Sequence, residues 1–208
     1  MKYIFVAGAP GSKWSSVVKN IYYSPSVDQS DYSDSRTYHH DASGKTELMH
    51  LGAYWDPGME FGDFFDDLQS HTKQECENEF DRPFLGTSTG IRIIKSHVFS
   101  HQIATIKERW PGCAIVLVHR SNDSCLGWWV KCGHFGITYP DYSKYYQNLR
   151  EMSFKIQQQN QGIIDAVNCY PTDVVGNNRD LAQMLNLAPP PLHHTQDYAA
   201  NNIKVNVI

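Results

Sequence analysis

Several features that identify a protein class at once are missing from this chain of 208 residues. Charged residues make up only 19% of it, and Lys plus Arg number 18 against 22 for Asp plus Glu. This balance excludes a generally basic protein that coats nucleic acid, although a local basic pocket stays open. The longest uninterrupted apolar run, Cys113 to Val118, is far shorter than the ~20 residues that span a bilayer. We therefore expect no nucleic-acid partner and no membrane span.

Metal and redox motifs are missing as well. The five cysteines include no CxxC pair, so neither a zinc ribbon nor a thioredoxin-type motif is indicated. His97 and His101 have the spacing of an HExxH motif, but the glutamate is absent, so no metal site is expected. This cysteine usage predicts a cytoplasmic location. Lys2 and the short apolar stretch Tyr3–Ala9 imitate a weak signal peptide, although a buried strand entering a glycine loop explains them better.

The residues that are present predict one α/β domain. Hydrophobic residues reach 41% and aromatic residues 12%, enough for a sizeable core. Apolar runs predict buried strands at Tyr3–Ala7, Ile91–Ile94, Cys113–Val118 and Ile163–Cys169. Helical spacing and end signals predict helices at Ser15–Tyr23, Ser100–Trp110, Ser121–Lys131, Tyr142–Gln161 and Asn178–Leu187. Their alternation predicts a parallel β-sheet with helices on both faces.

One long stretch, residues 24–90, has little periodicity and is rich in Ser, Asp, Tyr, Gly and His. We interpret it as an insertion that covers a site within a single domain, 1–208, because no second core is needed to explain it. It is expected to hold an aromatic loop at 52–62 and a helix within 63–79. Pro189-Pro190-Pro191 follows the last predicted helix, so residues 189–208 are expected to form a loosely held tail.

Three polar segments stand where predicted strands end. They are Gly8 to Ser16, Lys95 to His97, and Arg120 to Ser124. Ligands of parallel α/β sheets bind at the carboxyl ends of the strands. We therefore expect the three segments to form one site.

The first segment suits phosphate. Its glycines let the backbone wrap an anion, and a helix start offers N–H groups that carry partial positive charge. The Walker A motif GxxxxGK[ST] is incomplete, because Gly8 to Lys13 is one position too short and Trp14 replaces the Mg²⁺-binding Ser or Thr. The loop thus favours a phosphate ligand over Mg–ATP. An ordinary strand-to-helix turn with a solvated lysine is the alternative.

The other two segments supply charge and a base. Lys95 and His97 are two apart at a strand end, so their side chains point the same way, and one supplies charge while the other takes a proton. Simple capping of the strand is the alternative. Arg120 precedes the start of a predicted helix, and its guanidinium can donate two parallel hydrogen bonds to a phosphate. Its alternative role is to pair with Asp123 as a structural cap.

In order and spacing, these segments resemble the sulfotransferase family. The likeness covers Tyr3 to about Trp129 and, more weakly, residues 170–187. In that family a strand leads into a PxSGTT-like loop around the 5′-phosphosulfate of 3′-phosphoadenosine 5′-phosphosulfate (PAPS), and a later strand ends Lys-Thr-His, which Lys95-Ser96-His97 matches. The family's buried strand with a following Arg, Asp and Ser fits residues 115–124. The resemblance implies a P-loop-like fold and PAPS as donor.

It also implies roles for single residues. His97 would be the general base, Lys95 and Lys13 would stabilise developing charge, and the acceptor would be a hydroxyl or amine of a small molecule, sugar or peptide. Arg120, with Ser121 or Ser124, would hold the 3′-phosphate. Trp14 or Trp128 would stack on adenine, and the 52–62 loop with Tyr54, Trp55 and Asp56 would border the acceptor. The implied donor-binding residues are Pro10, Gly11, Ser12, Lys13, Trp14, Ser15, Ser16, Arg120, Ser121 and Ser124.

The chain also departs from the family pattern. With Pro10 aligned, the family's loop Lys or Arg falls at Gly11 and its glycine at Lys13. The family serine of the 3′-phosphate site falls near Gly127 or Trp128, and the RKGxxGDWK segment is missing. Two other functions therefore stay open, a P-loop kinase of a small metabolite and a non-catalytic protein that binds a nucleotide or a partner. No oligomeric state is predicted.

Overall fold

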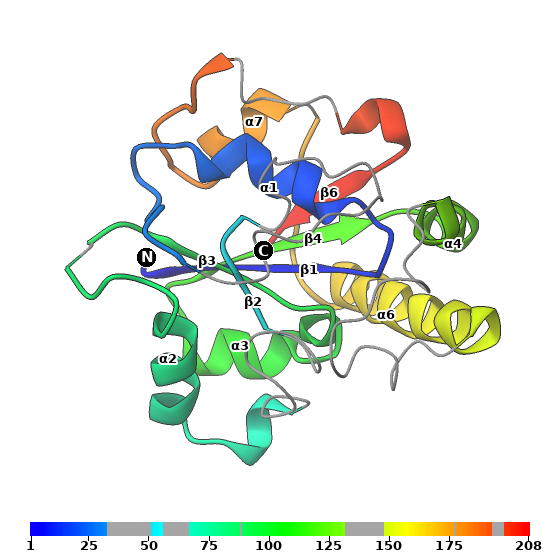
Figure 1. Ribbon diagram of the computed structural model, residues 1–208, viewed down its shortest axis with the longest axis horizontal. Helices are drawn as coiled ribbons and strands as arrows, with labels where there is room; N and C mark the ends of the chain where they lie inside the picture. The colour runs from blue at the N-terminus through cyan, green and yellow to red at the C-terminus, as the bar shows by residue number, and fades with distance from the viewer. Residues whose placement is uncertain (33–50, 56–66, 88, 132–147, 177, 193–197) are drawn as a thin grey trace.

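A mixed β-sheet forms the centre of the computed structural model (Figure 1). The structure describes residues 1–32, 51–55, 67–87, 89–131, 148–176, 178–192 and 198–208. Within these ranges the sheet has six strands in the order β2-β3-β1-β4-β6-β5. The three predicted strands at its centre are β1 (Tyr3–Gly8), β3 (Arg92–Lys95) and β4 (Ala114–His119). β1 runs parallel to β3 on one side and to β4 on the other, so all three end at the same edge of the sheet.

Helices cover both faces of this sheet, as the sequence predicts (Figure 1). One face carries α1 (Trp14–Tyr22) and α7 (Asn178–Met184), and the other carries α2 (Lys73–Asp81), α3 (Ile103–Arg109) and part of α6 (Leu149–Cys169). Because side chains alternate along a strand, β1 sends Ile4 and Val6 into the first core and Tyr3 and Phe5 into the second. Short 3₁₀ turns occur at η3 (Leu68–Ser70), η4 (Val98–His101) and η7 (Ala199–Asn201).

Two predictions are wrong at the edge of the sheet beyond β4. β2 (Ala53–Tyr54) adds a parallel strand, but β6 (Lys204–Val207) runs antiparallel to both of its neighbours, β4 and β5 (Asp173–Val174). The prediction of a parallel sheet is therefore wrong for β6, whereas β5 runs in the direction of β4. β6 begins beside the carboxyl end of β4, where Lys204 pairs with His119. A parallel strand would need a crossover connection that brings the chain back to the amino end of β4, so β6 runs antiparallel instead. Residues 198–208, expected to be a loose tail, instead bury Ile203, Val205 and Val207.

The predicted strand at Ile163–Cys169 is also wrong, because these residues form the last part of α6. Met152, Ile156, Ile163 and Ala166 are buried at helical spacing, so one apolar stripe runs along the whole helix. The helix begins at Leu149, where the Asn148 side chain accepts hydrogen bonds from two backbone N–H groups. Residues 142–147 of the helix predicted at Tyr142–Gln161 lie outside the described residues. In the described part of the chain, no helix combines the length and apolarity that crossing a bilayer requires.

The described parts of the 24–90 region are built into the core. The helix expected within 63–79 is α2, which begins after a capping box formed by Thr72 and Glu75. Trp55 and Phe80 are fully buried, with ring centroids 4.5 Å apart. This region therefore supplies a strand and a helix to the fold.

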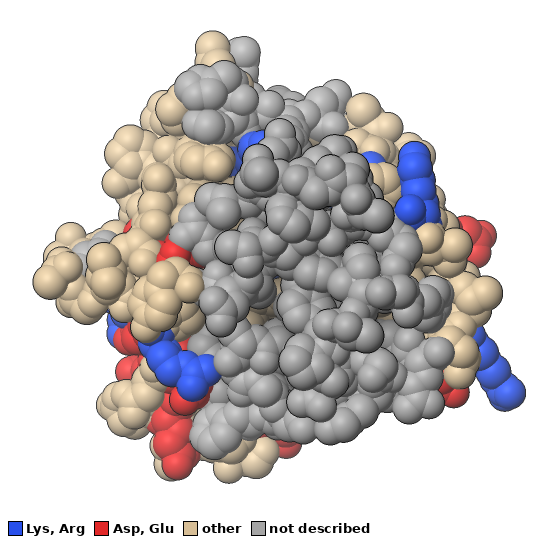
Figure 2. All heavy atoms as spheres, viewed as in Figure 1, with Lys and Arg blue, Asp and Glu red and all other residues tan. Residues whose placement is uncertain are grey.

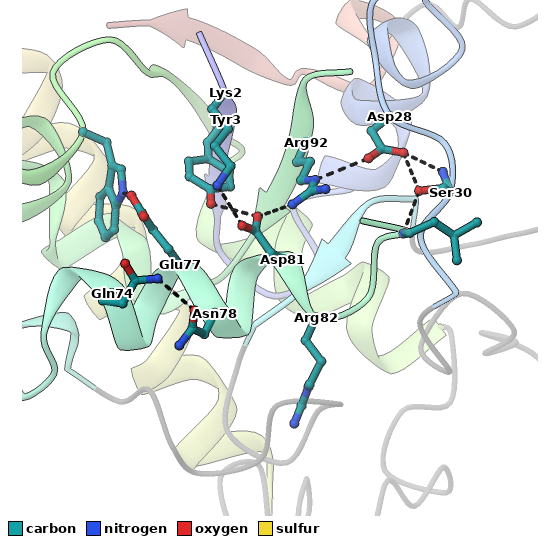
Figure 3. Close-up of polar contacts among 12 residues, drawn as sticks. Lys2, Tyr3, Asp28, Ser30, Gln74, Glu77, Asn78, Asp81, Arg82 and Arg92 are labelled. Carbon is teal, nitrogen blue, oxygen red and sulfur yellow. Dashed lines mark hydrogen bonds and ion pairs between the residues drawn. The ribbon is translucent and has the colours of Figure 1, made fainter. Parts of the chain in front are cut away.

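A cluster of charges ties α2 and the segment around residue 28 to the amino ends of β1 and β3 (Figure 3). Arg92, whose side chain is 9% exposed, donates to Asp28 at 3.3 Å and to Asp81 at 2.5 Å. Asp81 also accepts from Lys2 at 2.7 Å and from the Tyr3 hydroxyl at 2.8 Å. Burial alone lowers the pKa of Arg92, but its bonds to the two carboxylates more than offset this and raise it. Arg92 thus stays charged, and the cluster links elements that are distant in sequence.

Candidate functional site

The loop between β1 and α1 holds the first predicted segment. Ser12 N donates to Ala9 O at 3.0 Å, which closes a turn, and Ser16 N donates to Lys13 O at 2.9 Å. Gly11 has φ 78°, and a Cβ there would lie 2.1 Å from the carbonyl oxygen of Cys125. Only glycine fits at this position, both for its conformation and for the close approach of α4 (Asn122–Lys131).

The start of α1 keeps its partial positive charge. Lys13 has a left-handed conformation (φ 61°, ψ 30°), its side chain does not cap the helix, and the first turn has no acidic residue. Pro10 and Ser12 are buried, and Ser15 and Ser16 are half-buried in the first turn. Within the described part of the chain, the buried Ser12 Oγ has no hydrogen-bond partner. The loop therefore offers polar groups and a helix start, as an anion requires.

His97 lies against this loop. Its ring stacks on the Trp14 ring, with centroids 4.2 Å apart and planes 11° apart. Nδ1 donates to the carbonyl oxygen of Gly8, because a carbonyl can only accept. Nε2 is then the unprotonated nitrogen and accepts from the Tyr54 hydroxyl at 2.7 Å. The protein thus fixes one tautomer of His97.

Burial and charge keep this imidazole neutral. Burial, together with the charge of Lys95, lowers the pKa of His97 to about 3, although the hydrogen bond to the Gly8 carbonyl opposes the shift. Lys95 is fully buried, and its Nζ lies 5.7 Å from the centroid of the Trp14 ring and 5.5 Å from that of Tyr54. Lys95 and His97 therefore reach the same tryptophan. We call Trp14, Tyr54, Lys95 and His97 the inner cluster.

Arg120 joins three elements at the other side of the loop. Its NH1 donates to Gly11 O at 3.3 Å and to Ser124 O at 3.1 Å, and its Nε donates to Asn201 O at 3.1 Å. All three partners are backbone carbonyls, and no described contact joins Arg120 to Asp123. Arg120 thus holds the β1–α1 loop, α4 and η7 together.

Lys13 and Arg120 both bond to Asn201. Its Nζ donates to Asn201 Oδ1 at 2.7 Å and sits 3.8 Å from the centroid of the Trp128 ring. We call Lys13, Arg120, Ser124, Trp128 and Asn201 the outer cluster. Lys13 and Arg120 are each partly exposed, in contrast to the buried Lys95 and His97.

The start of α4 carries two serine hydroxyls beside the outer cluster. Ser121 Oγ and Ser124 Oγ are 2.9 Å apart, and Ser121 is exposed. Asn160 of α6 holds the start of α4 in place, because its Nδ2 donates to Arg120 O at 2.8 Å and to Asn122 Oδ1 at 2.7 Å. Phosphate oxygens are suitable acceptors for such exposed hydroxyls.

The three predicted segments therefore meet. The Gly8 carbonyl contacts His97, and the Gly11 carbonyl contacts Arg120. The predicted residues fall into an inner and an outer cluster, in which Lys95 and Lys13 have different described partners. The sequence did not indicate Asn160 or Asn201. Asp56 and residues 57–62, expected to border the acceptor, lie outside the described residues.

The charged side chains visible on one face of the molecule are of both signs. On the face seen in Figure 2, the visible Lys and Arg of the described residues lie among Asp and Glu at the margins. Comparisons with protein-family models, with curated proteins and with solved structures found no significant match to this chain.

Proposed function

We propose that this protein is a sulfotransferase that binds PAPS at the β1–α1 loop and moves its sulfuryl group to a hydroxyl or amine of an acceptor. One observation carries the proposal. Three segments whose side chains are chemically suited to phosphate binding and proton acceptance meet at the carboxyl edge of β1, β3 and β4, and the middle strand leads into the glycine loop.

The residues at the loop fit the donor. The uncapped start of α1, the buried Ser12 hydroxyl and the Lys13 ammonium would hold the 5′-phosphosulfate. The exposed Ser121 hydroxyl and its neighbour Ser124 would hold the 3′-phosphate. Arg120 would act mainly by fixing the loop and α4, because its guanidinium already donates to three carbonyls. When bound, the donor supplies the sulfuryl group and the second phosphate that distinguishes it from ADP-like nucleotides.

The inner cluster would take the acceptor's proton. His97 Nε2 is the basic nitrogen and already accepts from the Tyr54 hydroxyl, so a proton from the acceptor would pass to Tyr54 Oη as the Tyr54 proton passes to His97. The Gly8 carbonyl holds the imidazole in the tautomer that this transfer needs. Lys95 would stabilise negative charge that develops beside the cluster.

A second candidate is a non-catalytic nucleotide-binding protein. The observation that favours it is the state of His97, because both ring nitrogens have partners and burial lowers its pKa to about 3. Such an imidazole is a weak base at neutral pH. In this case the loop binds the same ligand and the inner cluster only supports the loop.

Two measurements test the proposal. Calorimetry should detect binding of 3′-phosphoadenosine 5′-phosphate without metal and no comparable binding of ADP with Mg²⁺; the reverse preference would instead favour a kinase. Transfer of labelled sulfuryl from PAPS to a panel of phenols, sugars and tyrosyl peptides then separates the enzyme from the binding protein.

A tyrosine variant tests the proton route. Tyr54→Phe removes only the hydroxyl on His97 Nε2, so transfer should fall by about 10²-fold or more while nucleotide binding stays unchanged. Tyr22→Phe is the matched control, because it removes another buried tyrosine hydroxyl, which is bonded to Asp31 at 2.6 Å, at the other end of α1 from Trp14. Equal activity of the two variants would exclude the route through Tyr54.

A further inference from the structure

The outer cluster is completed by a segment that no sequence motif marks. Asn201 contacts both cations of the cluster, since its side-chain Oδ1 accepts from Lys13 Nζ at 2.7 Å and its carbonyl accepts from Arg120 Nε at 3.1 Å. These two cations come from different elements, one from the β1–α1 loop and one from the end of β4. One residue therefore fixes the distance between two charges that the proposed site needs.

Asn201 is itself held firmly. Its N–H donates to Tyr198 O at 3.0 Å, and Tyr198 is 1% exposed. After Asn201 the chain buries Ile203 and enters β6, which pairs with β4 from Val116 to His119. Ile208 and Ile115 exchange two further backbone hydrogen bonds, at 2.9 and 3.0 Å. A residue anchored on both sides acts as a fixed support, and a flexible lid would lack these bonds.

From this geometry we infer that Asn201 is a positioning residue for phosphate binding, which holds the Lys13 ammonium over Trp128 and sets it at a fixed place beside Arg120. The inference rests on the proposed function, because it concerns the cations of the proposed phosphate site. The Asn201 amide is neutral, so it orients the ammonium without cancelling its charge. Lysine has four rotatable side-chain bonds, and fixing it before a ligand arrives lowers the entropic cost of binding.

The test measures ligand affinity and the state of Lys13 separately. Calorimetry with 3′-phosphoadenosine 5′-phosphate compares the full-length wild type with Asn201→Ala, which should bind roughly tenfold more weakly, as expected for loss of a hydrogen bond to a charged group. Asn206→Ala is the matched control, because Asn206 lies on β6 and has no described contact with Lys13 or Arg120. It should bind like the wild type.

The second readout needs no nucleotide. Acetylation of Lys13 by acetic anhydride, followed by mass spectrometry with Lys19 as internal reference, should be several-fold faster in Asn201→Ala than in wild type or Asn206→Ala. Asn201→Asp keeps an oxygen for Lys13 and adds a negative charge. It should therefore keep slow acetylation yet bind the nucleotide more weakly than wild type, a combination that general loosening of the fold would not produce. Asn201→Asp also provides the test if Asn201→Ala does not fold.

Each outcome separates the two claims. If wild type binds the nucleotide and Asn201→Ala binds equally well, the positioning role is wrong and the proposed function stands. If wild type does not bind, the proposed function fails; faster Lys13 acetylation in Asn201→Ala then still supports the fixed ammonium, and unchanged acetylation overturns that as well.

Discussion

Acid should destabilise this protein through His97. The imidazole is 3% exposed and donates to the Gly8 carbonyl, and burial lowers its pKa to about 3. In the unfolded chain the same group takes up a proton near pH 6.5. Between these two values the unfolded state binds more protons than the folded state, so the free energy of unfolding falls as the pH falls.

The size of this effect follows from the pH range between the pKa values of His97 in the unfolded and folded states. Each pH unit below about 6.5 removes up to about 1.4 kcal/mol per proton, so His97 accounts for a loss of about 3 kcal/mol between pH 7 and pH 4. His97→Asn offers an N–H to the Gly8 carbonyl but has no titrating ring. It should be less stable than wild type at pH 7, and the difference should shrink by about 3 kcal/mol at pH 4.

Urea unfolding followed by tryptophan fluorescence, repeated from pH 7 to pH 4, measures this difference. His101 and His119, whose pKa values are also lowered by burial, contribute equally to both proteins and cancel. Parallel stability profiles for wild type and variant would refute the reasoning, since they would mean that His97 titrates alike in the folded and unfolded states.

Two further predictions concern stability. Asp28→Ala removes one of the two carboxylates that bind the buried Arg92, so it should lower the free energy of unfolding in urea by about 3 kcal/mol. Lys73→Ala breaks an exposed ion pair with Glu77 and should lower it by less than about 1 kcal/mol. Similar losses for the two variants would contradict a buried cluster. Gly11→Ala should lower the melting temperature, because its φ is 78° and its Cβ meets the Cys125 carbonyl, while Gly127→Ala, with open space inside α4, should raise it by the equivalent of about 0.5–1 kcal/mol. Calorimetric shifts of the same sign would argue against this packing.

The centre of the fold could be predicted because its residues have few alternatives. β1, β3 and β4 are covered on both faces, so β1 and β4 are largely apolar runs and β3 centres on Ile93 and Ile94, and polar segments follow at their ends. The strand order at the far edge could not be read in the same way. Ile163 and Ile164 look like strand residues, although their stripe continues from Met152 and Ile156. The alternation of Ile203, Lys204 and Val205 was the available signal for β6.

The sequence predicted the charged and basic members of the site, but it predicted neither Asn160 and Asn201 nor the contacts. Lys95, His97 and Arg120 follow strands, so their neighbourhood follows from topology. Which atom bonds to which depends on distances that no spacing encodes. Arg120 donates to carbonyl oxygens, and His97 is enclosed by Trp14, Tyr54 and the Gly8 carbonyl. Asn201 lies 188 positions from the lysine it contacts, and only the folded chain brings the two together.

That separation has a consequence during synthesis. The ribosome adds Asn201 188 residues after Lys13, so the nascent chain carries Lys13 without its amide partner until those residues have been made. Pairings between such distant positions form slowly, since a long loop must close first. A chain truncated before Asn201 would therefore have a glycine loop that lacks this hydrogen bond.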